Sequence, residues 1–360
     1  MERFEFIDAI AGATVIHDAE TGELYVRKGD GSLPEATSVF FPGCSMVNYA
    51  MPLLEIVYDT LTSHGSVDGI SVLCCGKILM YEADGDVLRP SYERDLIERL
   101  AATSIKRIVL ACPNCMLALR NCLMDDPRTA DIELVTLPQE LVRLGYRVKG
   151  SEISEIVKGD GNASTLLCIH DSCPDRQFGE YAEGLRDILP SNFWADPLHS
   201  RSRSVCCGSL PRAAGKIEQA DKCADLNGTE ALQVSADALV TSCMSCAFQL
   251  NAAQHHVPAY HFLEFLYGRP IDWAAAPYFM KVRFLIDDYM GATTLDDVTA
   301  RKYASLDSDF TMPVLGGNAE SGEEAAGRAD ASPARGEADD DLAAASSVTI
   351  SNADTESIIV

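Results

Sequence analysis

The sequence lacks three features that would place the chain in other classes of protein. It has 29 basic residues against 54 acidic residues, a formal net charge of -25, and no basic stripe that could displace counterions from phosphates, so we expect no binding to nucleic acid. It has no run of about 18 apolar residues and no basic start followed by an apolar core and a cleavage site. We therefore expect a cytoplasmic protein without direct membrane insertion.

Cysteine is missing from both ends of the chain. Residues 1–36 form an N-terminal extension in which "TVIHDAETGELYVR" predicts a small hairpin that turns at "TGE". Residues 271–315 include "APYFMKVRFLIDDYMG" and predict a helical extension. Residues 316–360 are acidic, rich in alanine, glycine and serine and free of aromatics, so they predict a disordered acidic tail.

The middle of the chain, by contrast, holds all 13 cysteines. A chain of 360 residues is long enough to build hydrophobic cores without covalent links. Disulfides are also rare in the cytoplasm. The cysteines are therefore predicted to be metal ligands, redox groups or small core residues.

Ten of these cysteines form a series that occurs twice: a lone cysteine, an adjacent pair and a CxxC motif. The first copy consists of Cys44, Cys74, Cys75, Cys112 and Cys115. The second copy consists of Cys173, Cys206, Cys207, Cys243 and Cys246. The two intervals are 29 and 36 residues in the first copy and 32 and 35 in the second, and "LCCGK" matches "VCCGS". The match predicts an internal duplication of about 120 residues per copy.

Each copy alternates apolar, strand-like runs with longer amphipathic stretches. The expected strands cover residues 38–43, 69–75, 106–112, 132–137, 164–171, 203–208, 237–243 and 257–262. The expected helices lie near residues 46–63, 90–103, 115–124, 177–188, 213–234 and 244–253. Alternation of this kind is typical of parallel sheets covered on both faces. We therefore predict two tandem α/β lobes, residues 37–150 and 151–270.

The cysteine groups fall where strands end, which in open parallel sheets is the edge where ligands bind. We expect five thiols of each copy to meet at that edge. Gly43, Gly76 and Gly208 would let the backbone pass close to the sulfurs. Helices that begin after Cys115 and Cys246 would direct N–H groups at anionic sulfur.

Five thiolates per copy favour some metal chemistries over others. Soft sulfur ligands suit zinc, copper or iron–sulfur clusters. A structural zinc takes four ligands, one fewer than each copy offers, and a CxxC dithiol would leave the adjacent pair without a role. An iron–sulfur cluster can use all five, and we favour it over a zinc-stapled interaction scaffold and over dithiol chemistry.

The doubled series resembles the cysteine-rich CCG domain found in heterodisulfide reductase, in the subunit that splits the heterodisulfide, and in related iron–sulfur proteins. The phrases "FFPGCS" and "HDSCP" resemble the start of that family's motif in each copy. The resemblance implies two lobes related by a pseudo-twofold axis. It also implies one non-cubane [4Fe–4S] cluster per lobe, held by the five cysteines of each copy, with the two clusters facing one another.

The resemblance further implies a function in anaerobic metabolism. The chain would be the redox subunit of an oxidoreductase complex that reduces or oxidises a small substrate such as a disulfide. Residues 1–36 carry none of the tightly spaced cysteines of a ferredoxin segment, so a separate ferredoxin-like or flavoprotein subunit would supply electrons. The alternative is an electron-transfer subunit that only relays electrons between a flavoprotein dehydrogenase and a quinone or another carrier.

Four polar residues beside the cysteines are candidate catalytic residues. His170 and Asp171 could supply a proton, although hydrogen bonding to the loop backbone or to a cluster sulfur is the alternative. Lys77 and Arg212 could neutralise cluster charge or receive an acidic group of the substrate, with a solvated surface role as the alternative. The remaining cysteines are predicted to be core residues: Cys122, Cys168 and Cys223.

Overall fold

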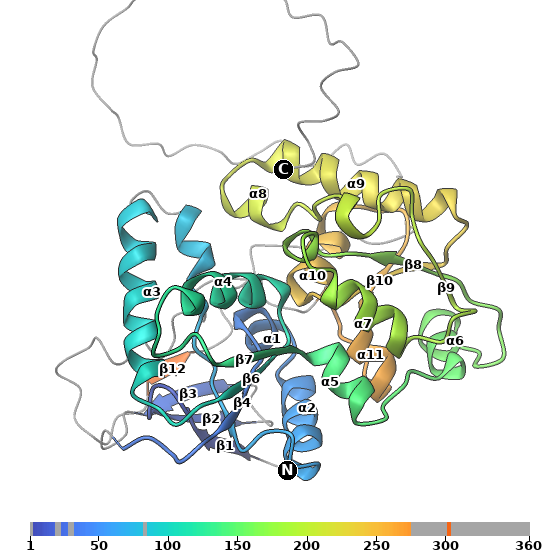
Figure 1. Ribbon diagram of the computed structural model, residues 1–360. Helices are drawn as coiled ribbons and strands as arrows, with labels where there is room; N and C mark the ends of the chain where they lie inside the picture. The colour runs from blue at the N-terminus through green and yellow to red at the C-terminus, as the bar shows by residue number, and fades with distance from the viewer. Residues whose placement is uncertain (1–2, 19–22, 28–31, 82–84, 275–300, 304–360) are drawn as a thin grey trace, which may run out of the picture. The chain divides into compact units, whose positions relative to one another are not determined.

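The computed structural model divides the chain into two units, Met1–Leu315 and Gly316–Val360 (Figure 1). The residues that it describes all belong to the first unit: 3–18, 23–27, 32–81, 85–274 and 301–303. The expected acidic tail and the helix expected near residues 276–291 lie outside the described residues.

Two four-stranded parallel sheets form the centres of two lobes. The first sheet has the order β5-β4-β6-β7 and consists of β4 (Ser38–Phe41), β5 (Gly69–Ile70), β6 (Arg107–Leu110) and β7 (Glu133–Thr136). The second has the order β9-β8-β10-β11 and consists of β8 (Leu167–His170), β9 (Trp194–Ala195), β10 (Ala238–Thr241) and β11 (Ala259–His261). Because the strands correspond one to one, the tandem α/β architecture is confirmed and the two halves have the same topology.

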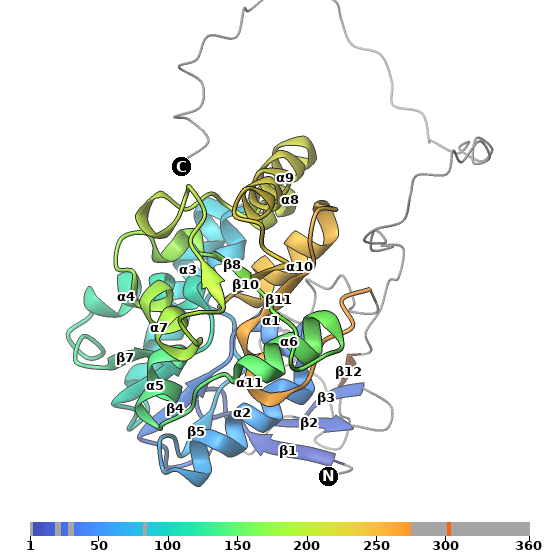
Figure 2. The ribbon, with the colours of Figure 1, turned by 90° about the vertical axis from the view of Figure 1, so that its right-hand side faces the viewer.

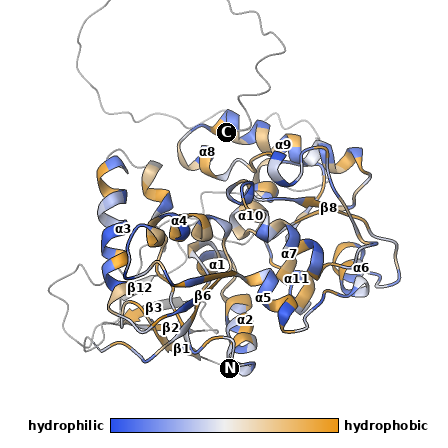
Figure 3. Ribbon diagram, viewed as in Figure 1, coloured by the Kyte–Doolittle hydropathy of each residue, from blue (hydrophilic) through white to orange (hydrophobic). Residues whose placement is uncertain are grey.

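Helices cover the sheets, so the central strands are apolar and buried (Figure 3). The strands β8 and β10 are buried throughout, and β4 and β6 are buried except for a half-buried first residue. In the first lobe the helices are α1 (Cys44–Tyr49), α2 (Met51–Ser63), η1 (Lys77–Tyr81), α3 (Gly85–Ala101), α4 (Pro113–Met124) and α5 (Leu137–Arg143). In the second they are α6 (Gly150–Lys158), η2 (Cys173–Asp175), α7 (Glu180–Ile188), η3 (Arg201–Arg203), α8 (Ser209–Ala213), α9 (Ile217–Gln233), α10 (Met244–Ala253) and α11 (Phe262–Tyr267). No helix in the described part of the chain is long and apolar enough to cross a bilayer.

The contacts between the lobes come in exchanged pairs, as a pseudo-twofold axis requires (Figures 1 and 2). The helix α5 of the first lobe packs on α7 of the second, and α11 of the second packs on α2 of the first. Likewise α1 contacts α10, and η2 contacts α4. The segments that follow the two CC pairs, η1 and α8, contact each other. Such reciprocal contacts are those of an isologous interface.

The N-terminal extension forms a separate antiparallel sheet of order β1-β2-β3-β12. Its strands are β1 (Arg3–Ile7), β2 (Thr14–Asp18), β3 (Glu23–Arg27) and β12 (Arg301–Tyr303). The expected hairpin is therefore confirmed as β2 and β3. The strand β12 lies inside the predicted helical extension, where pairing with β3 gives Arg301–Tyr303 an extended conformation.

One expected strand is wrong in part and another is wrong entirely, and both involve the CC pairs. Only Gly69–Ile70 of the stretch 69–75 is a strand. The Ser71 N–H still donates to the Phe40 carbonyl oxygen, but the Val72 and Leu73 N–H groups donate to the side chains of Asp8 and Ser71. The stretch 203–208 is not a strand at all, and the edge position belongs to β9 instead. In both lobes the chain leaves the sheet before the CC pair, so these cysteines lie on loops.

Candidate metal centre

The first cysteine set lies at the carboxyl ends of the strands of the first sheet, on three consecutive loops. Cys44 is the first residue of α1, just after β4. Cys74 and Cys75 lie in the buried loop between β5 and η1. Cys112 is the N-cap of α4, and Cys115 lies in the first turn of that helix.

The second set repeats this placement around the second sheet. Cys173 is the first residue of η2, just after β8. Cys206 and Cys207 lie on the loop before α8. Cys243 is the N-cap of α10, and Cys246 lies in its first turn. The expectation that the thiols gather at the sheet edges therefore agrees with the structure in both lobes.

The ten thiols form one continuous series of side-chain contacts that passes from one lobe to the other. In order, the series is Cys44, Cys74, Cys75, Cys115, Cys112, Cys243, Cys246, Cys207, Cys206 and Cys173. The two sets meet where Cys112 contacts Cys243. The hydroxyl groups of Ser45 and Ser245 also form a hydrogen bond between the lobes. Each set is thus complete within its lobe and adjacent to the other.

These thiols are unpaired and mostly sealed from water. All 13 cysteines of the chain are free. Seven of the ten in the two sets are buried, and the half-buried ones are Cys44, Cys173 and Cys206. Buried thiols with no disulfide partner and other thiols against them are the environment that a soft, sulfur-loving metal centre needs.

Contacts between thiols shift their pKa values in opposite directions. The Sγ atoms of Cys173 and Cys206 lie 3.9 Å apart, and this contact lowers the pKa of Cys206 to about 2 while it raises that of Cys173. In the first lobe, contact with Cys115 lowers the pKa of Cys75. These contacts favour the thiolate form of Cys206 and Cys75, and the thiolate is the form that binds metal.

Backbone N–H groups also point at the sulfurs. The Gly76 N–H donates to Cys74 Sγ at 3.4 Å, and the Gly208 N–H donates to Cys206 Sγ at 3.3 Å. Gly208 has φ +97°, and a Cβ there would lie 2.3 Å from the Ala220 carbonyl oxygen. Only glycine permits this turn, which brings the N–H to the sulfur. Hydrogen bonds of this kind tune the potential of iron–sulfur clusters.

The backbone at Gly43, the residue before Cys44, passes close to the CxxC motif of the first copy. Its φ is +76°, and a Cβ there would lie 2.9 Å from the Cys112 Cβ and 3.1 Å from the Cys115 Sγ. The chain can therefore pass this close to the CxxC motif only with glycine. The helices α4 and α10 begin at Pro113 and Met244, so Cys115 and Cys246 lie inside the first turns and not before them, whereas the range 244–253 expected for the second helix agrees with α10.

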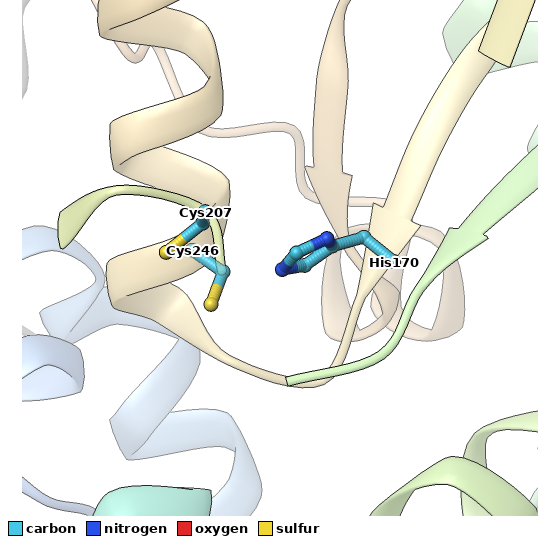
Figure 4. A group of neighbouring side chains, drawn as sticks. All are labelled: His170, Cys207 and Cys246. Atoms are coloured by element: carbon cyan, nitrogen blue, oxygen red, sulfur yellow. The ribbon is translucent and has the colours of Figure 1, made fainter. Parts of the chain in front are cut away.

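His170 and Asp171, the candidate proton donors, have different environments. His170 is 2% exposed. One ring nitrogen of His170 and the Sγ atoms of Cys207 and Cys246 all lie within 4.8 Å of one another (Figure 4). Burial lowers the pKa of the His170 imidazole. Asp171 instead forms a two-pronged ion pair with Arg186, with both N–O distances 2.8 Å, and accepts the Arg201 N–H. Asp171 therefore anchors the loop that leads to Cys173.

The two candidate cations lie on the segments that follow the CC pairs. Lys77 is half-buried at the start of η1, and its backbone N–H helps to lower the pKa of Cys75. Arg212, on α8, donates to the Gln249 side chain at 3.0 Å and pairs with Asp221. Because η1 contacts α8, the structure brings these two segments together at the lobe interface.

The three cysteines outside the repeat lie in hydrophobic surroundings. Cys168 and Cys223 are buried, and Cys122 is half-buried against the core. Burial raises the pKa of Cys122 and of Cys168 to about 12, so both stay protonated. Such inert thiols fit their predicted role as small core residues.

Asn227 on α9 is a site residue that sequence reasoning missed. Its amide nitrogen donates to the carbonyl oxygens of Cys206 and Cys223, and its Oδ1 lies 2.7 Å from His170 Nδ1. One signal was present: "NG", a turn dipeptide, stands in the middle of a 17-residue helix. The glycine is required because a Cβ at Gly228 would lie 2.6 Å from Gln254 Oε1.

The donor set defines the class of protein. Two groups of five cysteines, thiolates among them, with N–H donors at their sulfurs, suit a metal or iron–sulfur centre on a tandem α/β fold. The CCG cysteine-rich domain matches residues 38–120 and again residues 167–251. The chain therefore carries two copies of this domain, which confirms the resemblance to the CCG family at that level.

Other comparisons give no further information. No curated protein matches the chain in sequence. Among solved structures, the glutamate racemase isoform RacE1 of Bacillus anthracis is 11% identical, with 64% of this chain and 78% of that chain covered and a TM-score of 0.30. An ABC transporter solute-binding protein of Conexibacter woesei DSM 14684 is 11% identical over 62% and 68%, with a TM-score of 0.21. Likenesses this weak carry no argument.

Proposed function

We propose that the chain is an iron–sulfur redox subunit that resembles the heterodisulfide-splitting component of heterodisulfide reductase. Each lobe would hold one [4Fe–4S] cluster of the non-cubane kind through its five cysteines. The clusters would supply one-electron steps, and the substrate would be a small molecule such as a disulfide. A ferredoxin-like or flavoprotein subunit would deliver the electrons, and we expect the complex in the cytoplasm.

The observation that carries this proposal is the single series of ten thiols across the lobe interface. A zinc-stapled scaffold needs two separate groups of four ligands and gives no reason for Cys112 to contact Cys243. Two redox centres that exchange electrons, or that act together on one substrate, do need such closeness. The series therefore supports paired clusters over isolated metal sites.

The protein's own residues would bind the clusters, exclude water and leave one face accessible. The seven buried cysteines would shield the clusters, whereas the half-buried Cys44, Cys173 and Cys206 mark where a substrate can approach. Lys77, on η1, follows the first CC pair, and Arg212, on α8, follows the second. We propose that they attract an acidic substrate and offset the negative charge of the thiolates.

A pure electron relay between a flavoprotein dehydrogenase and a quinone or another carrier is the second candidate. The burial of Cys112 and Cys243 at the contact between the two sets favours it, because a relay needs no substrate there. The two candidates differ in their response to disulfides. A new paramagnetic signal on addition of a thiol or disulfide substrate supports catalysis, and its absence with all candidates supports the relay.

Anaerobic purification with iron, sulfide and zinc analysis tests the proposal. We expect brown protein with iron and inorganic sulfide in both lobes. The Cys75→Ser variant should lose about half of the iron, because a hydroxyl is a poor ligand and only the first lobe is affected. Purification under these conditions should also retain the electron-donor subunit.

Cys223→Ser is the matched control, since Cys223 is a buried cysteine of the second lobe outside the repeat. It should keep the full iron content and colour. Colourless protein with about one zinc per lobe would overturn the proposal in favour of a scaffold. Equal iron loss in Cys75→Ser and Cys223→Ser would contradict the assignment of ligands.

A further inference from the structure

We propose that His170 Nε2 is a ligand to the cofactor of the second lobe, which would give that lobe mixed cysteine and histidine coordination. The inference rests on the proposed function, since it concerns how one of the two clusters is held. It goes beyond the proposed function, in which five cysteines hold each cluster and the two sites have the same kinds of ligand.

The first observation is the position of the ring nitrogen. His170 is 2% exposed, and its Nε2 is buried without a hydrogen-bond partner among the described residues. A buried polar atom left without a partner is costly, so it signals a missing partner. The ring points toward Cys207 and Cys246, and the three ligand atoms lie within 4.8 Å of one another (Figure 4).

The second observation is that Asn227 determines the tautomer. Its amide nitrogen donates to two carbonyl oxygens, those of Cys206 at 3.1 Å and Cys223 at 2.8 Å. A flipped amide would place its oxygen against both carbonyls, so Oδ1 must be the atom that faces His170 Nδ1 at 2.7 Å. The Nδ1 atom therefore carries the proton and donates it. The neutral ring then presents the lone pair of Nε2 to the two sulfurs.

This arrangement is that of a metal-bound histidine. Ligating histidines usually donate their other ring N–H to an oxygen, and this second bond fixes the tautomer and the orientation of the ring. The Asn227 amide nitrogen also donates to the Cys206 carbonyl oxygen, so the same residue holds both the imidazole ring and the loop that carries Cys206 and Cys207. The geometry is therefore prepared for coordination before any metal enters.

The first lobe supplies the contrast. His170 is the last residue of β8 and stands three residues before Cys173. The equivalent residue at the end of β4, three residues before Cys44, is Phe41. A phenyl ring has no lone pair to offer, so the first lobe has no nitrogen ligand at this position. The ligands of an iron–sulfur cluster tune its reduction potential, so an additional imidazole ligand should give the second cluster a potential different from that of the first.

Pulsed electron paramagnetic resonance tests this on the intact protein. The protein is labelled with ¹⁵N-histidine, purified without oxygen and reduced to its paramagnetic state. We expect a nitrogen coupling as strong as that of the bound imidazole in a Rieske-type centre, which changes its pattern between ¹⁴N and ¹⁵N samples. Iron and sulfide content of the same samples reports on the proposed function separately.

Variants then assign the signal. The His170→Phe variant carries the residue that the first lobe has, so it should lose the coupling and shift the potential of one of the two reduction steps. His256→Gln is the control, an exposed histidine paired with Asp225 at 2.8 Å, and should retain both properties.

Two results would overturn the inference while the proposed function stands. The first is labelled wild-type protein with full iron and sulfide but no strong nitrogen coupling. The second is a His170→Phe variant in which both reduction steps keep their potentials. Protein without iron and sulfide would instead overturn the proposed function, and the assignment of His170 with it. The wild-type labelling experiment needs no variant to fold.

Discussion

At the scale of single residues, the site was predictable where chemistry follows from residue type and spacing. The ten cysteines and the three glycines beside them could be identified because thiols at strand ends and positive backbone angles leave a mark on the sequence. Asn227 and Asp8 left little or none, since their partners lie far away in the chain: Asp8 bonds the N–H of Val72. Hydrogen bonds between distant segments depend on the fold, and spacing does not reveal them.

Asp8 gives a prediction at this scale. Its carboxylate is fully buried and accepts the N–H groups of Ile10, Ala11 and Val72 at 2.8–3.0 Å, so it ties the N-terminal sheet to the loop that leads to Cys74. The Asp8→Ala variant should lose about 2–4 kcal/mol of unfolding free energy, because it leaves three buried N–H groups without an acceptor. Urea denaturation measures this loss.

Asp8→Ala should also lower the iron content of the first lobe, because the loop before Cys74 is no longer held. Asp59→Asn, at an exposed position on α2, is the control and should behave like the wild type. An Asp8→Ala variant with wild-type stability would show that the carboxylate does not position this loop.

At the scale of elements, strands and helices with a strong apolar pattern were predictable, and short edge strands were not. The central strands β4, β6, β8 and β10 were identified by apolar runs that end at a cysteine or just before one. The edge strand β9 has only two residues, Trp194–Ala195. Its extended conformation comes from its pairing with β8, and its own sequence carries no strand pattern. The strand β12 likewise depends on β3, which is far away in the sequence.

The helix α11 gives a prediction of pH dependence. The Glu264 carboxyl in its first turn is fully buried and accepts the N–H groups of His261 and Ile271, both at 2.7 Å. Burial raises the pKa of Glu264 to about 8. Because the folded protein keeps a proton that the unfolded chain releases above its usual pKa of about 4.3, the unfolding free energy should fall with pH between these two values.

The fall should be on the order of 1 kcal/mol per pH unit and should be absent in Glu264→Gln, which has no proton to lose. Denaturation of both proteins at several pH values from 5 to 8 measures the difference between them. Glu218→Gln, at an exposed position on α9, should follow the wild type. A constant difference between wild type and Glu264→Gln across this range would contradict the raised pKa.

At the scale of the whole molecule, the duplication was predictable but the extent of the shared core was not. A single hydrophobic cluster includes residues of both lobes, among them Phe40, Leu110, Tyr181 and Phe248. The rings of Tyr49 and Phe248 stack across the interface, with centroids 4.6 Å apart. Two copies of one sequence pattern do not reveal whether the copies fold separately, because that depends on which faces they bury together.

We therefore expect the two lobes to unfold in one transition. The buried Tyr181 hydroxyl of the second lobe donates to the Leu110 carbonyl oxygen of the first at 2.8 Å, two residues before Cys112. Tyr181→Phe should cost about 1–3 kcal/mol because the carbonyl is left unpaired. The experiment uses a Trp273→Phe background, because Trp273 lies against Tyr49 of the first lobe and would also fluoresce. Trp194 fluorescence, which then reports on the second lobe, and far-UV circular dichroism, which reports on both, should shift together.

Tyr146→Phe, at a half-buried tyrosine that contacts His64 within the first lobe, is the control and should change the midpoint less. Separate transitions in the two signals would show that the lobes are independent folding units.

The reciprocal contacts between the lobes have an evolutionary consequence. A protein with one copy of this domain and the same contact face would have met a second copy of itself across a true twofold axis, as homodimers do. Every substitution in such a dimer alters both halves at once. Fusion of two copies into one chain removes that constraint, and the pair Phe41 and His170 shows two equivalent positions that have since diverged.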